Sequence, residues 1–270
     1  MTLPPQTQDL AALQAVVESL YHRLPPFLPP TATACLCGLC MTAQSLAQMV
    51  ATPVRDIPVD LLRDYIESAH GVPENPDDLR ALLPRILDLM VQGTDIAGMG
   101  GQTELRRFGD ARAVHPALFD PQTQALLNRF AGLMLRHIWT AEADGPPAHY
   151  STLTLTETLL VGGWPPAVVT GALDTLFATA TGPAAPAPLL IALGDALHRQ
   201  GHFGLRTLAT DRPEAAPALA DWLNRLLLSP ALQALLMPLD PESDPWAAAL
   251  WTIAGDVRPT HFTAAAQALT

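Results

Sequence analysis

The sequence predicts an all-α fold, an irregular multi-helix bundle or helical array of about nine to eleven short helices. Apolar residues recur at spacings of three and four along most of the chain, which is the period of one helix face. Many of these stretches start with Asp-Pro, Asn-Pro or Ser-Pro, and such pairs are typical of helix starts. Alternating β-branched residues, which would indicate a strand, are scarce, and Ser151 to Thr158 is the nearest candidate.

The first elements follow from one apolar stripe and the prolines behind it. We expect a helix that reaches Leu24, because prolines between positions 25 and 30 then impose an extended connection. After the cysteines, Thr42 can cap a short second helix. The apolar residues of these two helices are Leu10, Leu13, Val17, Leu20 and Leu24, followed by Leu46, Met49 and Val50.

Two further helices are predicted between residues 58 and 90. Pro58 suits the first turn of one helix, and Gly71 suits its left-handed end. The stretch from Asn75 to Asp78 combines a cap, a proline and two carboxylates, which predicts the start of the next helix. Pro84 falls inside the apolar pattern of that helix, so we expect a kink or a break there. The apolar residues are Val59, Leu62, Ile66 and Ala69, then Leu79, Leu82, Leu83, Ile86, Leu87 and Met90.

The rest of the chain predicts a glycine-rich loop at 96–101 and a series of helices. A long helix opens at Asp120-Pro121 and runs to about Glu142, where Gly145-Pro146-Pro147 closes it. We expect a single domain over 1–270, and a division into 1–145 and 148–270 stays open. A Pro- and Ala-rich linker is expected at 182–188. The remaining predicted helices lie at 154–161, after 164–166, and at 189–199, 214–228, 230–237 and 245–254.

The charges of the chain exclude several classes of function. Its net charge is −11 and its pI is about 5.0, whereas duplex nucleic acid is held by clustered Lys and Arg that neutralise phosphates. The sequence therefore predicts neither a nucleic-acid partner nor binding to an anionic membrane surface. The chain has no lysine, since all 15 basic residues are Arg. This excludes a Walker-type phosphate loop, a protein-kinase site and Schiff-base chemistry, which all need Lys.

The sequence favours a cytoplasmic location. The N-terminal residues lack a basic region followed by an apolar block, so no secretory signal is expected. The most apolar window, Ala184 to Leu193, contains proline and is far shorter than the roughly 20 residues of a membrane span. Three cysteines cannot all pair within one chain, and a reducing compartment keeps such thiols free.

A cluster of three cysteines is the chemically suggestive feature of the sequence. Cys35, Cys37 and Cys40 lie within six residues, and the Cys-x-x-Cys spacing of the last two lets both sulfurs reach one ion. Thiolates suit zinc or copper(I), and structural zinc takes four ligands. His22 is the nearest histidine for a fourth position, while Met41 could serve copper(I). The predicted metal ligands are Cys35, Cys37, Cys40 and His22, and the expected ion is zinc or copper.

Two other interpretations of the cysteines stay open. A Cys-x-x-Cys pair can lower a thiol pKa and act as a redox centre, although no strand-then-helix pattern surrounds it here. Free cysteines also commonly serve as small buried apolar residues. An iron–sulfur cluster is less favoured, because one chain normally supplies four cysteines to it.

Other candidate sites have simpler interpretations. His198 and His202 could share a helix face with Asp195, but the glycine before the second histidine favours a polar helix end instead. The glycine-rich stretch Gly98–Gly101 lacks the spacing of a dinucleotide loop and follows no predicted strand. His137 lies on the long predicted helix, where a lone histidine is usually a packed or surface residue.

Three segments carry a family resemblance. They are the cysteine cluster, the sequence Thr52-Pro53-Val54-Arg55-Asp56-Ile57 and the sequence Leu83-Pro84-Arg85-Ile86-Leu87-Asp88-Leu89. The stretch from Cys35 to about Met90, about a fifth of the chain, resembles an uncharacterised bacterial family of hypothetical proteins. Members of that family carry adjacent cysteines, whereas the cysteines here are spaced. The resemblance implies that the cysteines and the Leu-Pro-Arg segment belong to one structural unit, and it implies no activity.

Three functional hypotheses follow. The first is a cytoplasmic helical binding or adaptor protein with an unknown protein partner, because helices are predicted without a catalytic signature. The second is a metal-binding protein that uses the cysteine cluster for zinc or copper. The third is an enzyme whose acid and base residues converge only in three dimensions, so the sequence leaves enzymatic activity undecided.

Overall fold

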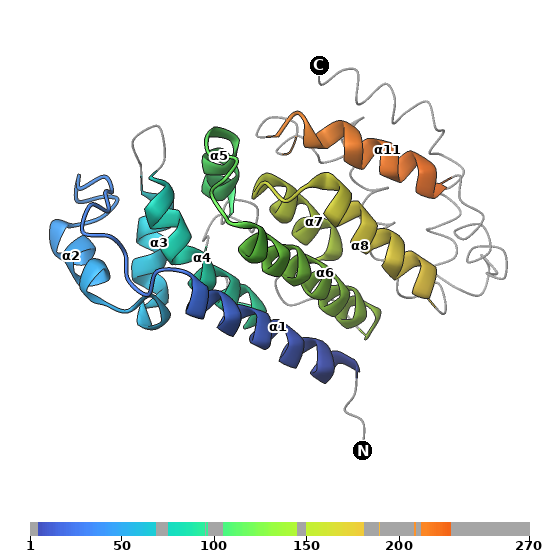
Figure 1. Cartoon of the computed structure of the whole chain (residues 1–270), viewed down its shortest axis with the longest axis horizontal. Helices are drawn as coiled ribbons and strands as arrows, with labels where there is room; N and C mark the ends of the chain where they lie inside the picture. Colours follow the sequence, from blue (N-terminus) through green and yellow to red (C-terminus); the bar gives the residue numbers. More distant parts are fainter. Residues whose placement is uncertain are drawn as a thin grey trace. The chain divides into compact units, whose positions relative to one another are not determined.

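The computed structural model confirms the all-α prediction. It describes residues 5–68, 75–94, 96, 105–144, 150–180, 189, 208 and 212–227. Within these residues the chain forms nine α-helices and one short 3-10 helix, and no strand (Figure 1). The elements are α1 (Pro5–Arg23), α2 (Ala43–Ala51), η1 (Val54–Asp56), α3 (Val59–Glu67), α4 (Pro76–Val91), α5 (Arg106–Val114), α6 (Pro121–Asp144), α7 (Thr152–Val161), α8 (Pro166–Thr179) and α11 (Ala215–Leu227).

The chain divides into two compact units. One comprises Met1–Met134 with Val161–Gly163, and the other comprises Leu135–Leu160 with Trp164–Thr270. The division passes through helix α6, whereas the sequence marks Gly145-Pro146-Pro147 as the best boundary. The proposed single domain over 1–270 stays a prediction.

The core of the first unit forms where α1 packs along α4. The stripe of α1 is buried as predicted at Leu13, Val17 and Leu20, and α1 ends at Arg23 just before the prolines. Asn75 caps α4, since its side chain accepts a hydrogen bond from the backbone N–H of Asp77. Apolar spacing therefore predicts both helices, and a local cap marks the start of α4.

Polar contacts tie α3 and Ile57, which precedes it, to α4. The hydroxyl of Tyr65, whose side chain is fully buried, donates to an oxygen of Asp78 at 2.7 Å. The Arg85 guanidinium donates twice to the backbone carbonyl of Ile57, both at 3.2 Å, and also pairs with Asp88. Arg85 belongs to the Leu-Pro-Arg segment, so this segment is tied directly to the stretch that follows the cysteines.

Of the kink or break expected at Pro84, the break does not occur. Helix α4 runs without interruption from Pro76 to Val91, with Pro84 buried inside it. An internal proline removes one backbone hydrogen bond and costs a helix about 3 kcal/mol or more. The neighbouring leucines are also buried, at Leu79, Leu82, Leu83 and Leu87. Burial of one such side chain contributes about 1.5–3 kcal/mol, so packing of this face outweighs the proline.

Helices α5 and α7 differ in how well the sequence predicts them. Helix α5 was not predicted, because Leu105 at its start offers no side-chain cap. Its apolar residues Leu105, Phe108 and Ala111 are nevertheless spaced by three and buried. The helix predicted at 154–161 is confirmed as α7, Thr152–Val161, so the nearest strand candidate, Ser151 to Thr158, is helical from Thr152 onward. Its threonines donate to backbone carbonyls one turn earlier, as Thr156 does to Thr152, and so satisfy their hydroxyls within a helix.

An aromatic group lies in the core of the second unit. The rings of Trp139 and Phe177 meet edge to face with centroids 4.9 Å apart, and Trp222 lies 5.8 Å from Phe177. The indole N–H of Trp222 donates to Asp174 at 2.7 Å. These contacts join α6, α8 and α11 within that unit, and α8 and α11 lie side by side (Figure 1).

Several predicted segments lie outside the described residues. They are the glycine-rich positions 97–101, the residues 145–147, the linker at 182–188 and the helices at 230–237 and 245–254. Most of the predicted helix at 189–199 and the group of Asp195, His198 and His202 also lie outside them. Among the helices that the structure describes, none combines the length and the apolar character that crossing a bilayer requires.

Candidate metal site

The segment before α2 holds the three cysteines between buried anchors. On one side Leu28 and Ala32 are buried, and on the other Met41 is 2% exposed. The backbone N–H of Val54 donates to the carbonyl of Pro26 at 2.8 Å and so fixes the start of the segment. The short stretch between the anchors, residues 35–40, is called the cysteine loop below.

Helix α2 begins directly behind the cysteine loop. The Thr42 hydroxyl accepts a hydrogen bond from the backbone N–H of Ser45 at 3.0 Å, which caps the helix as predicted. Met49 is fully buried on the inner side of this helix. The loop is therefore held at its C-terminal end by a capped helix and by two buried methionines.

The cysteine loop brings all three sulfur atoms together. The Sγ atoms of Cys35, Cys37 and Cys40 lie within 4.8 Å of one another, and all three are free thiols. Cys37 is exposed, whereas Cys35 and Cys40 are half-buried. Gly38 turns the chain with a φ of +82°, a backbone conformation that side chains other than glycine rarely adopt. A glycine at this position thus allows the chain to return a third sulfur to the first two.

Backbone amides polarise the central thiol. The N–H groups of Cys40 and Leu39 hydrogen-bond to the sulfur of Cys37 and lower its pKa to about 7. The pKa of Cys35 is raised, chiefly by the side-chain hydrogen bond that Cys35 makes with Cys37. One thiolate can thus be present near neutral pH before any ion binds, and hydrogen bonds within the loop stabilise it.

The residues that precede and follow the loop in the sequence have uncharged side chains. From Leu24 to Val54 the sequence contains no Asp, Glu, Lys, Arg or His. Two leucines of the loop face solvent, with Leu36 50% exposed and Leu39 96% exposed. Apart from its own thiols, the cysteine loop therefore lies in an uncharged segment of a chain whose net charge is −11. The sequence shows this feature as a run without charged residues rather than as a motif.

The structure does not place His22 with the cysteines. Within the described residues, the group of clustered metal-ligating side chains comprises Cys35, Cys37 and Cys40. His22 lies in the last turn of α1 and is exposed, and Met41 is buried. The three predicted cysteine ligands thus come together, and the fourth predicted ligand does not.

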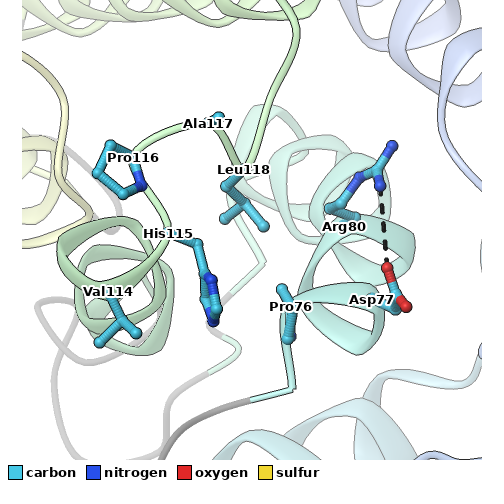
Figure 2. Close-up of a pocket in the computed structure, with 8 residues that line it drawn as sticks. All are labelled: Pro76, Asp77, Arg80, Val114, His115, Pro116, Ala117 and Leu118. Atoms are coloured by element: carbon cyan, nitrogen blue, oxygen red, sulfur yellow. Dashed lines mark ion pairs between the residues drawn. The ribbon is translucent and has the colours of Figure 1, made fainter.

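A shallow hollow of about 420 Å³ offers a second candidate site in the first unit. The start of α4 and the segment after α5 line it, and Figure 2 shows Leu118 and His115 on its wall. Asp77 and Arg80 form an ion pair at 3.8 Å on the opposite side, so their charges offset each other. The hollow has one imidazole and no clustered carboxylates, which gives little support to an acid–base site.

Two buried carboxylates of the second unit could not be identified as unusual from the sequence. Glu142 on α6 accepts hydrogen bonds from the backbone N–H and the hydroxyl of Thr152 at the start of α7. Burial raises the pKa of Glu142, although these hydrogen bonds oppose the shift. Glu157 is 4% exposed, and burial raises its pKa to about 8. Only the packing of α6 and α7 identifies these groups, because their sequence neighbours are ordinary.

Comparison of the chain with protein-family models, with curated proteins and with solved structures found no match. The family resemblance noted in the sequence therefore stays a prediction.

Proposed function

We propose that this chain binds a thiophilic metal ion through Cys35, Cys37 and Cys40. The observation that carries the proposal is the convergence of three free thiols within 4.8 Å of one another. Soft sulfur ligands select soft or borderline ions, so the candidate ions are those with high affinity for thiolate. The proposal extends the metal hypothesis drawn from the sequence and omits His22 from the ligand set.

The spacing of the sulfur atoms suits coordination to one ion. A Zn–S bond of about 2.3 Å in tetrahedral geometry separates two sulfur atoms by about 3.8 Å. The sulfurs of the cysteine loop lie within 4.8 Å of one another, so they need to approach by at most about 1 Å to share one ion. The N–H groups of Leu39 and Cys40 hydrogen-bond to one sulfur and support a thiolate ligand there.

The interpretation of the cysteines as packed apolar residues has less support. A packed thiol is buried, whereas Cys37 is exposed and its two neighbours are half-buried. The buried positions next to the loop are taken by Ala32 and Met41 instead. A redox role uses the same proximity of sulfurs, and the experiment below distinguishes it.

Metal analysis of the purified full-length chain tests the proposal. The chain is purified under reducing conditions, exposed separately to zinc(II) and copper(I), and desalted before elemental analysis. We expect about one equivalent of ion to be retained, and Cys37→Ser to lower the affinity at least about tenfold. Thr31→Ser, an exposed change in the same uncharged segment, is the matched control and should retain the ion.

Two outcomes contradict the proposal. Retention of less than about a tenth of an equivalent of every thiophilic ion offered to the reduced chain would contradict it directly. Equal retention by the native chain and by Cys37→Ser would place the ion elsewhere. Formation of a reversible disulfide within the loop, without retention of either ion, would favour the redox interpretation instead.

The adaptor hypothesis stays a second, untested proposal. Large apolar side chains that are exposed within the described residues are Phe27, Leu36, Leu39 and Val114. Two of these four lie in the cysteine loop itself, so a protein partner and a metal ion would use overlapping surface. The metal proposal is preferred because it rests on donor atoms that already converge.

A further inference from the structure

We infer that the ion for which the cysteine loop is best suited is a trivalent, lone-pair-bearing one, with arsenic(III) as its representative. This inference rests on the proposed function, because it names the ion class for the same three sulfurs. It follows from the number of ligands, the charge around them and the side from which they approach.

The number of donor atoms separates the candidate ions. Among the described residues, the His, Cys, Asp and Glu side chains clustered here are the three cysteines, with no fourth side chain of these types. Structural zinc is four-coordinate, so zinc in this loop would need an outside ligand. Trivalent arsenic forms three bonds and keeps a lone pair where a fourth ligand would stand. Three sulfurs from one short loop therefore complete its coordination.

The charge of the complex separates the ions further. Three thiolates with copper(I) carry two negative charges, with zinc(II) one, and with arsenic(III) none. No cationic side chain lies between Leu24 and Val54 to offset a residual negative charge. Two backbone N–H groups stabilise a negative charge at Cys37, and any further charge on the half-buried Cys35 and Cys40 would be uncompensated. The neutral complex therefore suits this segment best.

The direction from which the three sulfurs reach an ion also suits arsenic(III). The three sulfurs come from six consecutive residues, so they reach an ion from one side. An ion with a lone pair forms a pyramid with its three ligands at the base, and its free side points away from them. The exposed Leu36 and Leu39 flank Cys37 in the chain and add apolar surface to the loop, which suits a complex without net charge.

The binding step balances without an oxidant or a reductant. Arsenite is present at neutral pH as arsenic trihydroxide, a neutral molecule. Each cysteine forms one As–S bond, one As–O bond breaks, and the thiol proton leaves with the hydroxide as water. Three thiols and one trihydroxide thus give the tris-thiolate complex and three water molecules, and arsenic remains trivalent throughout.

Native mass spectrometry of the reduced full-length chain with arsenite tests this inference. The expected mass increase is one arsenic atom minus three hydrogen atoms, with all three thiols protected from alkylation. In Cys37→Ser, arsenic can bind two sulfurs and should keep one hydroxyl, and we expect an affinity at least about tenfold lower. Thr31→Ser should behave as the native chain, and circular dichroism should show equal helix content in all variants.

The outcomes separate this inference from the proposed function. If zinc(II) or copper(I) is retained but arsenite binds the native chain no better than Cys37→Ser, the inference is wrong and the proposed function stands. If arsenite fails to displace zinc(II) from the native chain at equal concentration, the preference for a trivalent ion is also wrong. If no ion is retained by the reduced native chain, both proposals fail.

Discussion

The cysteine loop and the carboxylates of α6 and α7 differ in where their ionisable groups lie. In the loop, Cys37 is exposed and its charge is stabilised by backbone N–H groups close in sequence. In the second unit, Glu142 and Glu157 are 7% and 4% exposed, and burial raises the pKa of both. Groups of the first kind are accessible to a ligand, whereas groups of the second kind are coupled to the stability of the fold.

Substitutions in the two regions are expected to have different effects. Changes in the cysteine loop should alter ion binding and leave the free energy of unfolding nearly constant, since surface changes usually shift stability by about 0.5 kcal/mol or less. Changes at the buried carboxylates should alter stability and leave ion binding constant. Four predictions follow, in order of decreasing expected effect.

The largest effect is expected from pH at Glu157. Its pKa is about 8 in the folded chain and near the ordinary 4.5 in the unfolded chain, so only the folded state holds the proton between these values. The free energy of unfolding should therefore fall as pH rises from 5 to 8, by up to about 1.4 kcal/mol per pH unit. Glu157→Gln should flatten this profile in urea titrations, and the exposed Glu214→Gln should not. An unchanged slope in Glu157→Gln would disprove the assignment.

The next effect is expected from Cys37→Ser. Loss of one of three sulfur ligands should weaken binding of the retained ion by about 100-fold, close to 2.7 kcal/mol. Urea unfolding of the ion-free variant should match the native chain to within about 0.5 kcal/mol, because Cys37 is exposed. A large loss of stability in the ion-free variant would show that this thiol has a packing role.

A smaller effect is expected from Thr152→Val. The change removes the hydroxyl that donates to the buried Glu142, so one carboxylate oxygen loses a partner. The free energy of unfolding should fall by about 1–3 kcal/mol, measured by urea titration, with no change in ion affinity. The matched control is Thr175→Val on α8, where the exposed hydroxyl donates only to the carbonyl of Gly171. A loss as large in the control as in Thr152→Val would contradict the role of Glu142.

The smallest effect is expected from Gly38→Ala. A Cβ at this position meets no atom within 4 Å, so the cost is the left-handed backbone alone, about 1–2 kcal/mol. We expect this strain to weaken ion affinity roughly tenfold by disfavouring the bound loop conformation. Gly171→Ala, on an exposed helical site that is also open, should instead stabilise the chain by about 0.5–1 kcal/mol. Equal ion affinities in Gly38→Ala and the native chain would show that the turn is not required.

The sequence by itself determined the helices that start with strong local signals, and the convergence of the thiols. Asn75 and Asp120 each accept backbone N–H groups at a helix start, as their positions before proline predicted. The cysteines lie within six residues, so a single turn at Gly38 suffices to gather them. Interactions between residues close in the chain depend little on the rest of the fold, and this is why they could be predicted.

The tertiary structure determined the features that depend on residues far apart in the sequence. Burial determined that α5 forms without a cap and that α4 continues through Pro84. Burial also determined which carboxylates lose water, and the fold leaves the exposed His22 outside the thiol group. A periodic pattern specifies which face of a helix is apolar, but it does not specify which face of another helix will cover it.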